Sequence, residues 1–396
     1  MTIRSYYGDS YRWEFDATVL EVLDESGAPR VVLDASYFYP TSGGQPHDTG
    51  TLGNANVMDV SIRASDGALL HHVDAPVAIG PTNATIHGAR RFDHMQQHSG
   101  QHILSQAFIR VANATTIGFH LADTVSIDLD APALSDATIA DATEVANQLL
   151  AANVAVRAWF PSAEELADIT LRKMPDVDGP VRIVAIGDFD ISACGGTHVA
   201  RAGEVGLLSV VRTERMKRGT RIEFMAGHRA RADYARKHAI VQQLSAALTC
   251  APAELPDAVA RQANTIADTR RALVAYRERD LDDEALALAA QATQHGAVKV
   301  VRATWTGRAI DEVKGLALRL TTEADTVVLF GVDGARVQLV FARSENVTLD
   351  LKPAFDRALA ALGGGKGGGG RILMGSASSM GAAALEEVLG NVELPS

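Results

Sequence analysis

Apolar and polar residues alternate along roughly the first 88 residues, in runs such as 17–23 and 30–35, with turn-forming residues between the runs. A period of two is typical of half-buried β-strands. Several short strands in succession predict closure into a small β-barrel or a sandwich. The stretch 39–46, YPTSGGQP, is too rich in proline and glycine for a central strand, so it is either a shaped loop or a plain connector.

The pattern changes to a helical period at 93–108, where His94, His98 and His102 recur every fourth residue. This spacing places the three imidazoles on one face of a helix. A separate apolar stripe would dock the helix against a core, so the histidines need not form its buried face. The stripe consists of Ile103, Leu104, Ala107 and Phe108.

Strand-like and helical segments alternate after this helix, which indicates an α+β arrangement with a sheet backing the histidines. An alanine-rich helix is expected from Ser135, its N-cap, to Ala152. The strand-like segments are 116–129, 154–160, 181–186 and 205–211.

A long helical stretch begins near Ala232, breaks at 249–252 and resumes after Pro256. Three apolar residues, seven apart, follow the break: Val259, Ile266 and Leu273. This spacing fits a helical spacer or hairpin, core packing, or a short seam between two copies of the chain.

The predicted fold class is therefore α+β, in four parts. An N-terminal small β-barrel occupies 1–89, an α+β domain with the candidate site 90–231, a helical spacer 232–293 and a C-terminal α/β domain 294–396. The boundaries follow the changes of hydrophobic period along the chain.

A second group of metal-binding residue types lies far along the chain, in the loop Cys194-Gly195-Gly196-Thr197-His198. A cysteine with histidines is an acceptable ligand set for zinc. Gly195 and Gly196 allow positive φ and so let the loop fold tightly. The alternative is a plain turn with a buried thiol and a surface imidazole. A four-ligand site, however, would be completed if Cys194 and His198 supplied two ligands and two helix histidines supplied the others.

Composition limits the class of protein. Of 396 residues, 47% are hydrophobic and 21% are charged, as in ordinary globular domains. Two cysteines form no disulfide framework, which favours a reducing compartment, the cytoplasm. Without a run of 18 apolar residues or a signal-peptide core, membrane insertion and secretion are not expected.

A net charge of -11 argues against a protein that coats nucleic acid without specificity. A local basic cluster nevertheless follows the cysteine loop and suits either a phosphate-rich substrate or an ordinary exposed loop. It contains Arg212, Arg215, Lys217, Arg218 and Arg221.

The run Gly363–Gly370, GGGKGGGG, superficially suggests a phosphate-binding loop. Lys366 is followed by glycine instead of serine or threonine, and no strand is expected to lead into the run, so nucleotide binding is excluded. A slack linker and a backbone that approaches RNA phosphates are the two remaining interpretations.

The motifs HSGQH and CGGTH, preceded by YPTSGGQ, resemble those of the AlaX family of alanyl-tRNA editing proteins. The likeness spans about residues 5 to 235. The C-terminal third is similar to the tail domain of alanyl-tRNA synthetase and to the accessory domain of DHH phosphoesterases, which would make this chain a long form of AlaX.

The resemblance implies that residues 90–231 form a zinc-dependent editing domain, with His94 outside the site. Its zinc ligands would be His98, His102, Cys194 and His198. The implied substrate is tRNA(Ala) wrongly charged with serine, with glycine as a second candidate. Zinc could polarise the ester carbonyl, lower the pKa of a bound water, or anchor the substrate amino group.

Roles beyond the ligands also follow from the resemblance. Thr41 would sense the serine hydroxyl and, with Gln45, act in catalysis, while Gly43 and Gly44 shape the same pocket. Contact with tRNA phosphates is assigned to Arg215, Lys217, Arg218 and Arg221. No carboxylate is expected beside the ligands, and Ser99 stands where a metalloprotease has its general base, which excludes a peptidase.

Three functions are compatible with these features. The first is a trans-editing hydrolase that deacylates mischarged tRNA(Ala). The second is a non-catalytic tRNA-binding module with a structural zinc. The third is a metal-dependent hydrolase of another small ester or amide. In each case the protein is expected to be a monomer, or a homodimer formed through its C-terminal region.

Overall fold

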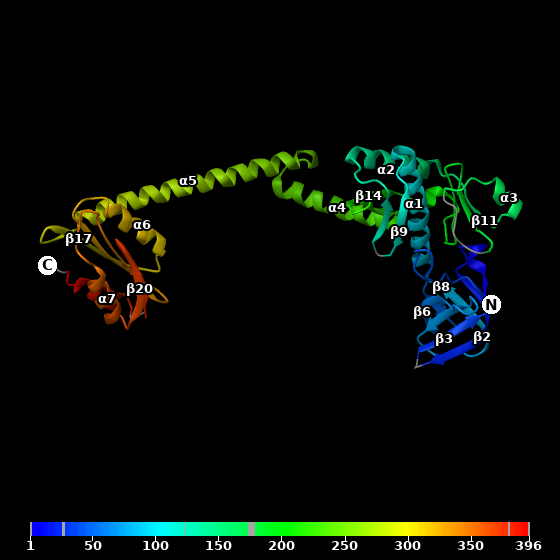
Figure 1. The fold of residues 1–396 in the computed structure, drawn as a ribbon, viewed down its shortest axis with the longest axis horizontal. Helices are drawn as coiled ribbons and strands as arrows, with labels where there is room; N and C mark the ends of the chain where they lie inside the picture. Colours follow the sequence, from blue (N-terminus) through cyan, green and yellow to red (C-terminus); the bar gives the residue numbers. More distant parts are fainter. Residues whose placement is uncertain (1, 26–27, 123, 173–178, 379–380, 395–396) are drawn as a thin grey trace. The chain divides into compact units, whose positions relative to one another are not determined.

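The computed structural model describes residues 2–25, 28–122, 124–172, 179–378 and 381–394 (Figure 1). The chain divides into two compact units, Met1–Leu244 and Ser245–Ser396. This division is coarser than the four predicted domains, whose finer boundaries remain predictions.

The first unit begins with a closed barrel of antiparallel strands, in the order β2-β3-β7-β6-β5-β8. Its interior is filled by apolar side chains such as Val19, Leu33, Leu52 and Val60, all fully buried. The predicted barrel is confirmed. Its strands are β2 (Glu14–Glu25), β3 (Ala28–Leu33), β5 (Gly50–Leu52), β6 (Ala55–Ile62), β7 (Leu69–Val73) and β8 (Gly80–Ile86), with the short pair β1 (Ile3–Arg4) and β4 (Ala35–Ser36) beside them.

Two antiparallel sheets complete the first unit. A four-stranded sheet has the order β14-β15-β10-β9, and a three-stranded sheet has the order β11-β12-β13. The segment 116–129 was expected to be one strand and is instead a hairpin of two strands. The strands are β9 (Thr116–Leu121), β10 (Val125–Leu129), β14 (Leu208–Arg215), β15 (Thr220–Ala226), β11 (Val156–Trp159), β12 (Ile183–Ile186) and β13 (Asp190–Ala193).

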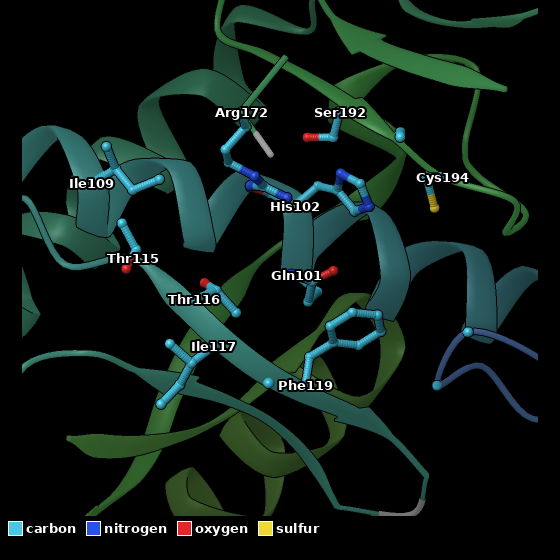
Figure 2. Close-up of a pocket in the computed structure, with 14 residues that line it drawn as sticks. Gln101, His102, Ile109, Thr115, Thr116, Ile117, Phe119, Arg172, Ser192 and Cys194 are labelled. Carbon is cyan, nitrogen blue, oxygen red and sulfur yellow. The ribbon is translucent and has the colours of Figure 1, made fainter. Parts of the chain in front are cut away.

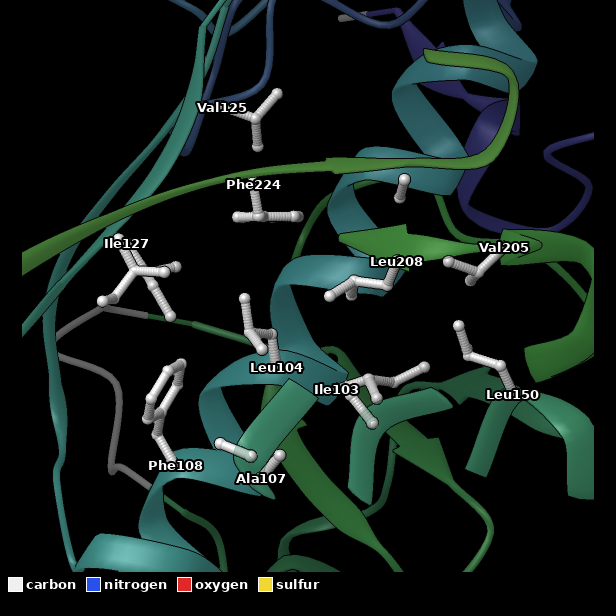
Figure 3. Close-up of a cluster of buried hydrophobic side chains, with 14 of the residues drawn as sticks. Ile103, Leu104, Ala107, Phe108, Val125, Ile127, Leu150, Val205, Leu208 and Phe224 are labelled. Atoms are coloured by element: carbon white, nitrogen blue, oxygen red, sulfur yellow. The ribbon is translucent and has the colours of Figure 1, made fainter. Parts of the chain in front are cut away.

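Helix α1 (Gly88–Ala112) carries the histidines and packs against the four-stranded sheet and α2 (Asp136–Ala152). Its predicted apolar stripe meets Val125, Ile127 and Phe224 of the sheet (Figure 3). The Ser135 side chain caps α2, as predicted, by accepting a hydrogen bond from the backbone N–H of Thr138. The short α3 (Ala163–Asp168) follows β11.

The sequence did not require the histidines to lie on a buried face of α1, but the structure buries them. His98 and His102 are buried, together with nearly every residue of α1 from Asp93 to Phe108. Polar side chains on the buried faces are stabilised by hydrogen bonds, as where the Gln97 side-chain amide exchanges two bonds with the Ala226 backbone. The helix is thus a central element, enclosed on all sides.

A buried ion pair joins α1 to the barrel. Arg91 and Asp48 are both fully buried, and the guanidinium Nε donates to both carboxylate oxygens at 3.0 Å. The same carboxylate also accepts a hydrogen bond from the backbone N–H of Tyr39 at 2.6 Å. The start of the YPTSGGQP stretch is therefore tied to the base of α1, which makes it a shaped loop.

The second unit contains a six-stranded sheet covered on both faces. Helices α7 (Lys352–Ala361) and α8 (Ala382–Gly390) cover one face, and α6 (Ile310–Leu320) with the end of α5 (Leu255–Ala290) covers the other. This is the predicted C-terminal α/β layering. In spatial order the strands are β16 (Thr293–His295), β17 (Val298–Thr306), β18 (Thr326–Asp333), β19 (Val337–Arg343), β21 (Ile372–Ala377) and β20 (Gly365–Gly369).

The boundary between the units falls within α4 (Gly227–Leu248), which is followed by the predicted break and α5. The seven-residue series Val259, Ile266 and Leu273 is about half exposed on α5. Core packing, one of the three interpretations of this series, is therefore wrong for this chain.

The glycine run was expected to be a loop, but five of its residues form the edge strand β20. Backbone pairing with β21 dictates this conformation: Gly367 faces Gly375, and a Cβ on Gly367 would lie 2.6 Å from the Cα of Gly375. Glycine is unfavourable in strands in general, but here it permits close backbone approach. Among the described residues, no helix is both long and apolar enough to cross a membrane.

Candidate functional site

Two segments about a hundred residues apart converge on one point. Helix α1 presents His98 and His102, and the loop after β13 presents Cys194 and His198. One potential ligand atom from each residue lies within 4.8 Å of the other three. The Cys194 Sγ atom is 3.3 Å from His98 Nε2 and 3.2 Å from His198 Nε2. Three nitrogens and one sulfur around a common centre match the donor set of a tetrahedral metal site.

Each of the three imidazoles is oriented by a different hydrogen-bond partner on its Nδ1 atom. His98 Nδ1 lies 2.8 Å from Gln45 Oε1, and His102 Nδ1 lies 3.2 Å from Asp190 Oδ2. His198 Nδ1 lies 3.1 Å from Ser99 Oγ. With a proton on each Nδ1, the Nε2 lone pairs remain available to a cation.

The CGGTH loop is shaped by a close approach to α1 at Gly196. A Cβ on this residue would lie 2.1 Å from Cε1 and 2.4 Å from Nδ1 of His98, so no larger side chain fits. Neither Gly195 nor Gly196 has positive φ, so the loop does not use the conformation that these glycines allow. The buried Arg182 braces the loop by donating to the carbonyl oxygens of Cys194 and Gly196, at 3.0 and 2.8 Å.

The charge balance of the four residues favours a cation. Burial alone would raise the pKa of the Cys194 thiol, but the imidazoles of His98, His198 and His102 hold that pKa well below its usual range. Burial lowers the pKa of His198 to about 3, which keeps this imidazole neutral near pH 7. Burial acts on His102 in the same direction, but the Cys194 sulfur and the Asp190 carboxylate raise the pKa of His102 instead. A cation that displaces this proton would bind a thiolate and deprotonated Nε2 atoms, the ligand forms that hold a metal.

A cavity of about 850 Å³ adjoins these residues, and Cys194 and His102 belong to both the cluster and the cavity wall (Figure 2). The wall is partly apolar, with Phe119 and Ile117 from β9, and carries the cation of Arg172. Arg172 is held in place by a 3.1 Å bond to the His102 carbonyl oxygen and by the nearby Asp190 carboxylate. A molecule bound in this cavity would therefore lie beside two residues of the cluster.

The predicted substrate-binding residues take different positions relative to this cavity. Gly43 and Gly44 line it, with φ of 53° and 80°. Gln45 is fully buried, and its amide bonds His98 and Thr197. Thr41 is exposed, is not among the cavity-lining residues, and has its hydroxyl 3.0 Å from His47 Nδ1.

The predicted tRNA-binding residues lie on the β14–β15 hairpin. Arg221 is bound to Asp128 on β10 by two hydrogen bonds, at 2.7 and 2.8 Å. Arg215, Lys217 and Arg218 are exposed near the hairpin tip and have no side-chain partner within the described part of the chain.

Several residues that support the cluster through hydrogen bonds were not predicted from the sequence. Asp190 adjoins His102, although no carboxylate was expected beside the ligands, and Ser99 supports His198. Arg182 carried no signal, because a single arginine before a strand is common. The position of Asp190, four residues before Cys194, was a signal in the sequence that could have identified it. His94 is buried outside the cluster, with no partner for its Nδ1 atom among the described residues.

Comparisons with known proteins agree on one family. Residues 181–223 match the threonyl and alanyl tRNA synthetase second additional domain. The alanyl-tRNA editing protein AlaX-L of Pyrococcus horikoshii is 28% identical over 384 residues, which is 93% of each chain. The alanyl-tRNA editing protein Aarsd1 of Mus musculus is 30% identical over 275 residues, 65% of this chain and 66% of its own.

Alanyl-tRNA synthetases also match. The alanine–tRNA ligase of Pyrococcus furiosus is 31% identical over 344 residues, and this chain spans 37% of its length. The solved C-Ala domain of Aquifex aeolicus alanyl-tRNA synthetase aligns with 25% of this chain and 98% of its own, at 20% identity and a TM-score of 0.22, too low to establish a shared fold. From the synthetase domain match and the full-length similarity to AlaX-L, the chain belongs to the AlaX-like family of alanyl-tRNA editing proteins.

Proposed function

We propose that this protein hydrolyses the ester bond between tRNA(Ala) and a wrongly attached serine, with glycine as a second substrate. The observation that carries the proposal is the sharing of Cys194 and His102 between the metal-binding cluster and the cavity wall. An ester carbonyl bound in this cavity would lie beside the cluster. Similarity to proteins named for alanyl-tRNA editing supports the substrate class.

The residues fit zinc by donor type, since a thiolate and three imidazoles are its common tetrahedral ligands. We propose that His98, His102, Cys194 and His198 hold it. A bound zinc ion that accepted a fifth ligand, or that lost one of the four, would supply Lewis-acid polarisation of a carbonyl or lower the pKa of a water bound to it.

The surrounding residues would position the ligands and the substrate. Gln45 holds the His98 ring, while Asp190 accepts from His102 and increases its basicity. Phe119 and the Gly43-Gly44 backbone would limit access of water to the reacting ester, because they form the wall of the cavity near the cluster. The hydroxyl-sensing role predicted for Thr41 from the family resemblance remains a prediction.

Recognition of the tRNA itself is proposed for the unpaired cations Arg215, Lys217 and Arg218 at the hairpin tip. Arg221 also belongs to the predicted set, although its guanidinium already binds Asp128. The predicted cytoplasmic location agrees with this substrate.

Release of serine from Ser-tRNA(Ala) tests the proposed function, with Ala-tRNA(Ala) as the matched control. We expect rapid release of serine, little release of alanine, and loss of activity after treatment with a zinc chelator, reversed by added zinc. Binding of tRNA without release of serine would instead support the non-catalytic module. Turnover of small esters at the same rate without tRNA would support the third function.

A further inference from the structure

Gln101 lies on α1 immediately before His102 and lines the cavity (Figure 2). Its side chain is 98% buried, with a relative exposure of 2%. The amide Nε2 donates to Ser105 Oγ at 2.9 Å, and Ser105 Oγ also accepts from Thr116 Oγ1 at 2.7 Å. The first bond engages the Nε2 end of the amide, and the second holds the Ser105 hydroxyl in place.

The other end of this amide is unsatisfied. Gln101 Oε1 is buried and has no hydrogen-bond partner among the described residues. An unpaired buried acceptor is unfavourable and uncommon in folded proteins. Gln97, one turn earlier on the same helix, shows the usual outcome, because its Oε1 and Nε2 both find partners. The free acceptor of Gln101 therefore points to a ligand that donates a hydrogen bond.

We propose that Gln101 Oε1 accepts the side-chain hydroxyl of a seryl ester and so determines specificity. This inference rests on the proposed function. With the ester carbonyl beside His102, the serine hydroxyl is three bonds from the carbonyl carbon, and Gln101 and His102 both line the same cavity. A neutral amide oxygen suits a neutral hydroxyl. The substrate ammonium is a poorer fit for this cavity wall, which also carries the Arg172 cation.

Specificity follows from the same unpaired atom. Alanyl and glycyl esters have no donor at the position of the serine hydroxyl, so Gln101 Oε1 stays unsatisfied when they bind. Thr41 is the other candidate for this contact, but its hydroxyl is 3.0 Å from His47 Nδ1 and Thr41 does not line the cavity. If Gln101 makes the contact, Gln101→Met lowers the preference for serine; if Thr41 makes it, Thr41→Val does so instead.

The test compares kcat/KM for Ser-tRNA(Ala) with kcat/KM for Gly-tRNA(Ala), in the full-length zinc-loaded protein. Gln101→Met removes the acceptor and keeps the side-chain volume. We expect it to lower the serine-to-glycine ratio by about 10- to 100-fold, the range for loss of one buried hydrogen bond. Gln101→Glu keeps an acceptor oxygen and should retain most of the ratio. Gln106→Met, on the same helix but outside the cavity lining, is the matched control.

An equal fall in kcat/KM for both esters in Gln101→Met would overturn the inference. Gln101 would then contact a group that the seryl and glycyl esters have in common. The inference would also be overturned if Gln101→Met left the serine-to-glycine ratio of kcat/KM unchanged while Thr41→Val removed the preference for serine. If Gln101→Met fails to fold, Gln101→Ala also lacks the acceptor and must show the same fall in ratio. Failure of the wild type to release either amino acid would refute the proposed function, a result distinct from these.

Discussion

At Gly196 the loop after β13 passes so close to α1 that a single methyl group has no room. The nearest atoms to a Cβ at this position are those of the His98 ring, followed by Gln45 Oε1 at 3.0 Å. The neighbouring Gly195 is different, because a Cβ there would meet only the Tyr7 hydroxyl at 3.6 Å, an ordinary contact. Two adjacent glycines thus have different structural roles.

This difference predicts the behaviour of two variants. Gly196→Ala should displace the His98 ring or break its bond to Gln45, and so weaken zinc binding by at least about 10-fold. Gly195→Ala should bind zinc like the wild type. Competition against a chromogenic chelator measures both affinities. Equal affinities in the two variants would show that the approach at Gly196 does not control the ligand geometry.

At the scale of elements, β10 and β15 are joined by the ion pair of Asp128 and Arg221, which are also register partners. The Arg221 hydrogen bonds lower the pKa of Asp128. The pair therefore stabilises the sheet fully above the unfolded-state pKa of the carboxyl group, about 3.9, and this contribution is lost as pH falls through the lower folded-state pKa.

Asp128→Asn should accordingly lower the free energy of unfolding by about 1 kcal/mol at pH 7. The difference in the free energy of unfolding between this variant and the wild type should disappear as pH falls from about 5 to 2. Urea denaturation at a series of pH values measures it, with Asp130→Asn, an exposed neighbour, as the control. A difference that stays constant across this range would mean that the ion pair is not its source.

The tip of the β14–β15 hairpin carries the second prediction at this scale. Replacing Arg215, Lys217 and Arg218 with alanine should raise KM for charged tRNA about 10-fold, leave kcat near the wild-type value, and flatten the dependence on salt. Arg212→Ala is the matched control, because Arg212 pairs with Glu223 on β15. A fall in kcat with KM unchanged would exclude a role limited to phosphate binding.

For the molecule as a whole, the parts of the site that depend on local sequence could be predicted. The period of four in α1 and the CGGTH loop are visible in the chain, and the structure brings them together. Their supporting residues could not be predicted, because Gln45, Asp190 and Ser99 reach the histidines across separations of 53, 88 and 99 residues. Such contacts depend on tertiary packing, which no local period encodes.

Tertiary context also explains the errors in the fold. The polar residues on the histidine face of α1 gave no sign of burial, yet this face is enclosed by elements that precede and follow α1 in the sequence. The glycine run looked like a loop because glycine disfavours strands, yet β21 supplies a pairing partner. In both cases packing overrides a local preference.

The central claim is that Cys194 and three histidines bind one metal ion, and cobalt titration tests it most directly. We expect Co²⁺ added to metal-free protein to produce a thiolate-to-cobalt charge-transfer band that saturates at one equivalent. The band should be absent in Cys194→Ser and present in Cys250→Ser, which changes the other cysteine of the chain. A wild-type protein without the band, or a band that depends on Cys250, would contradict the proposed site.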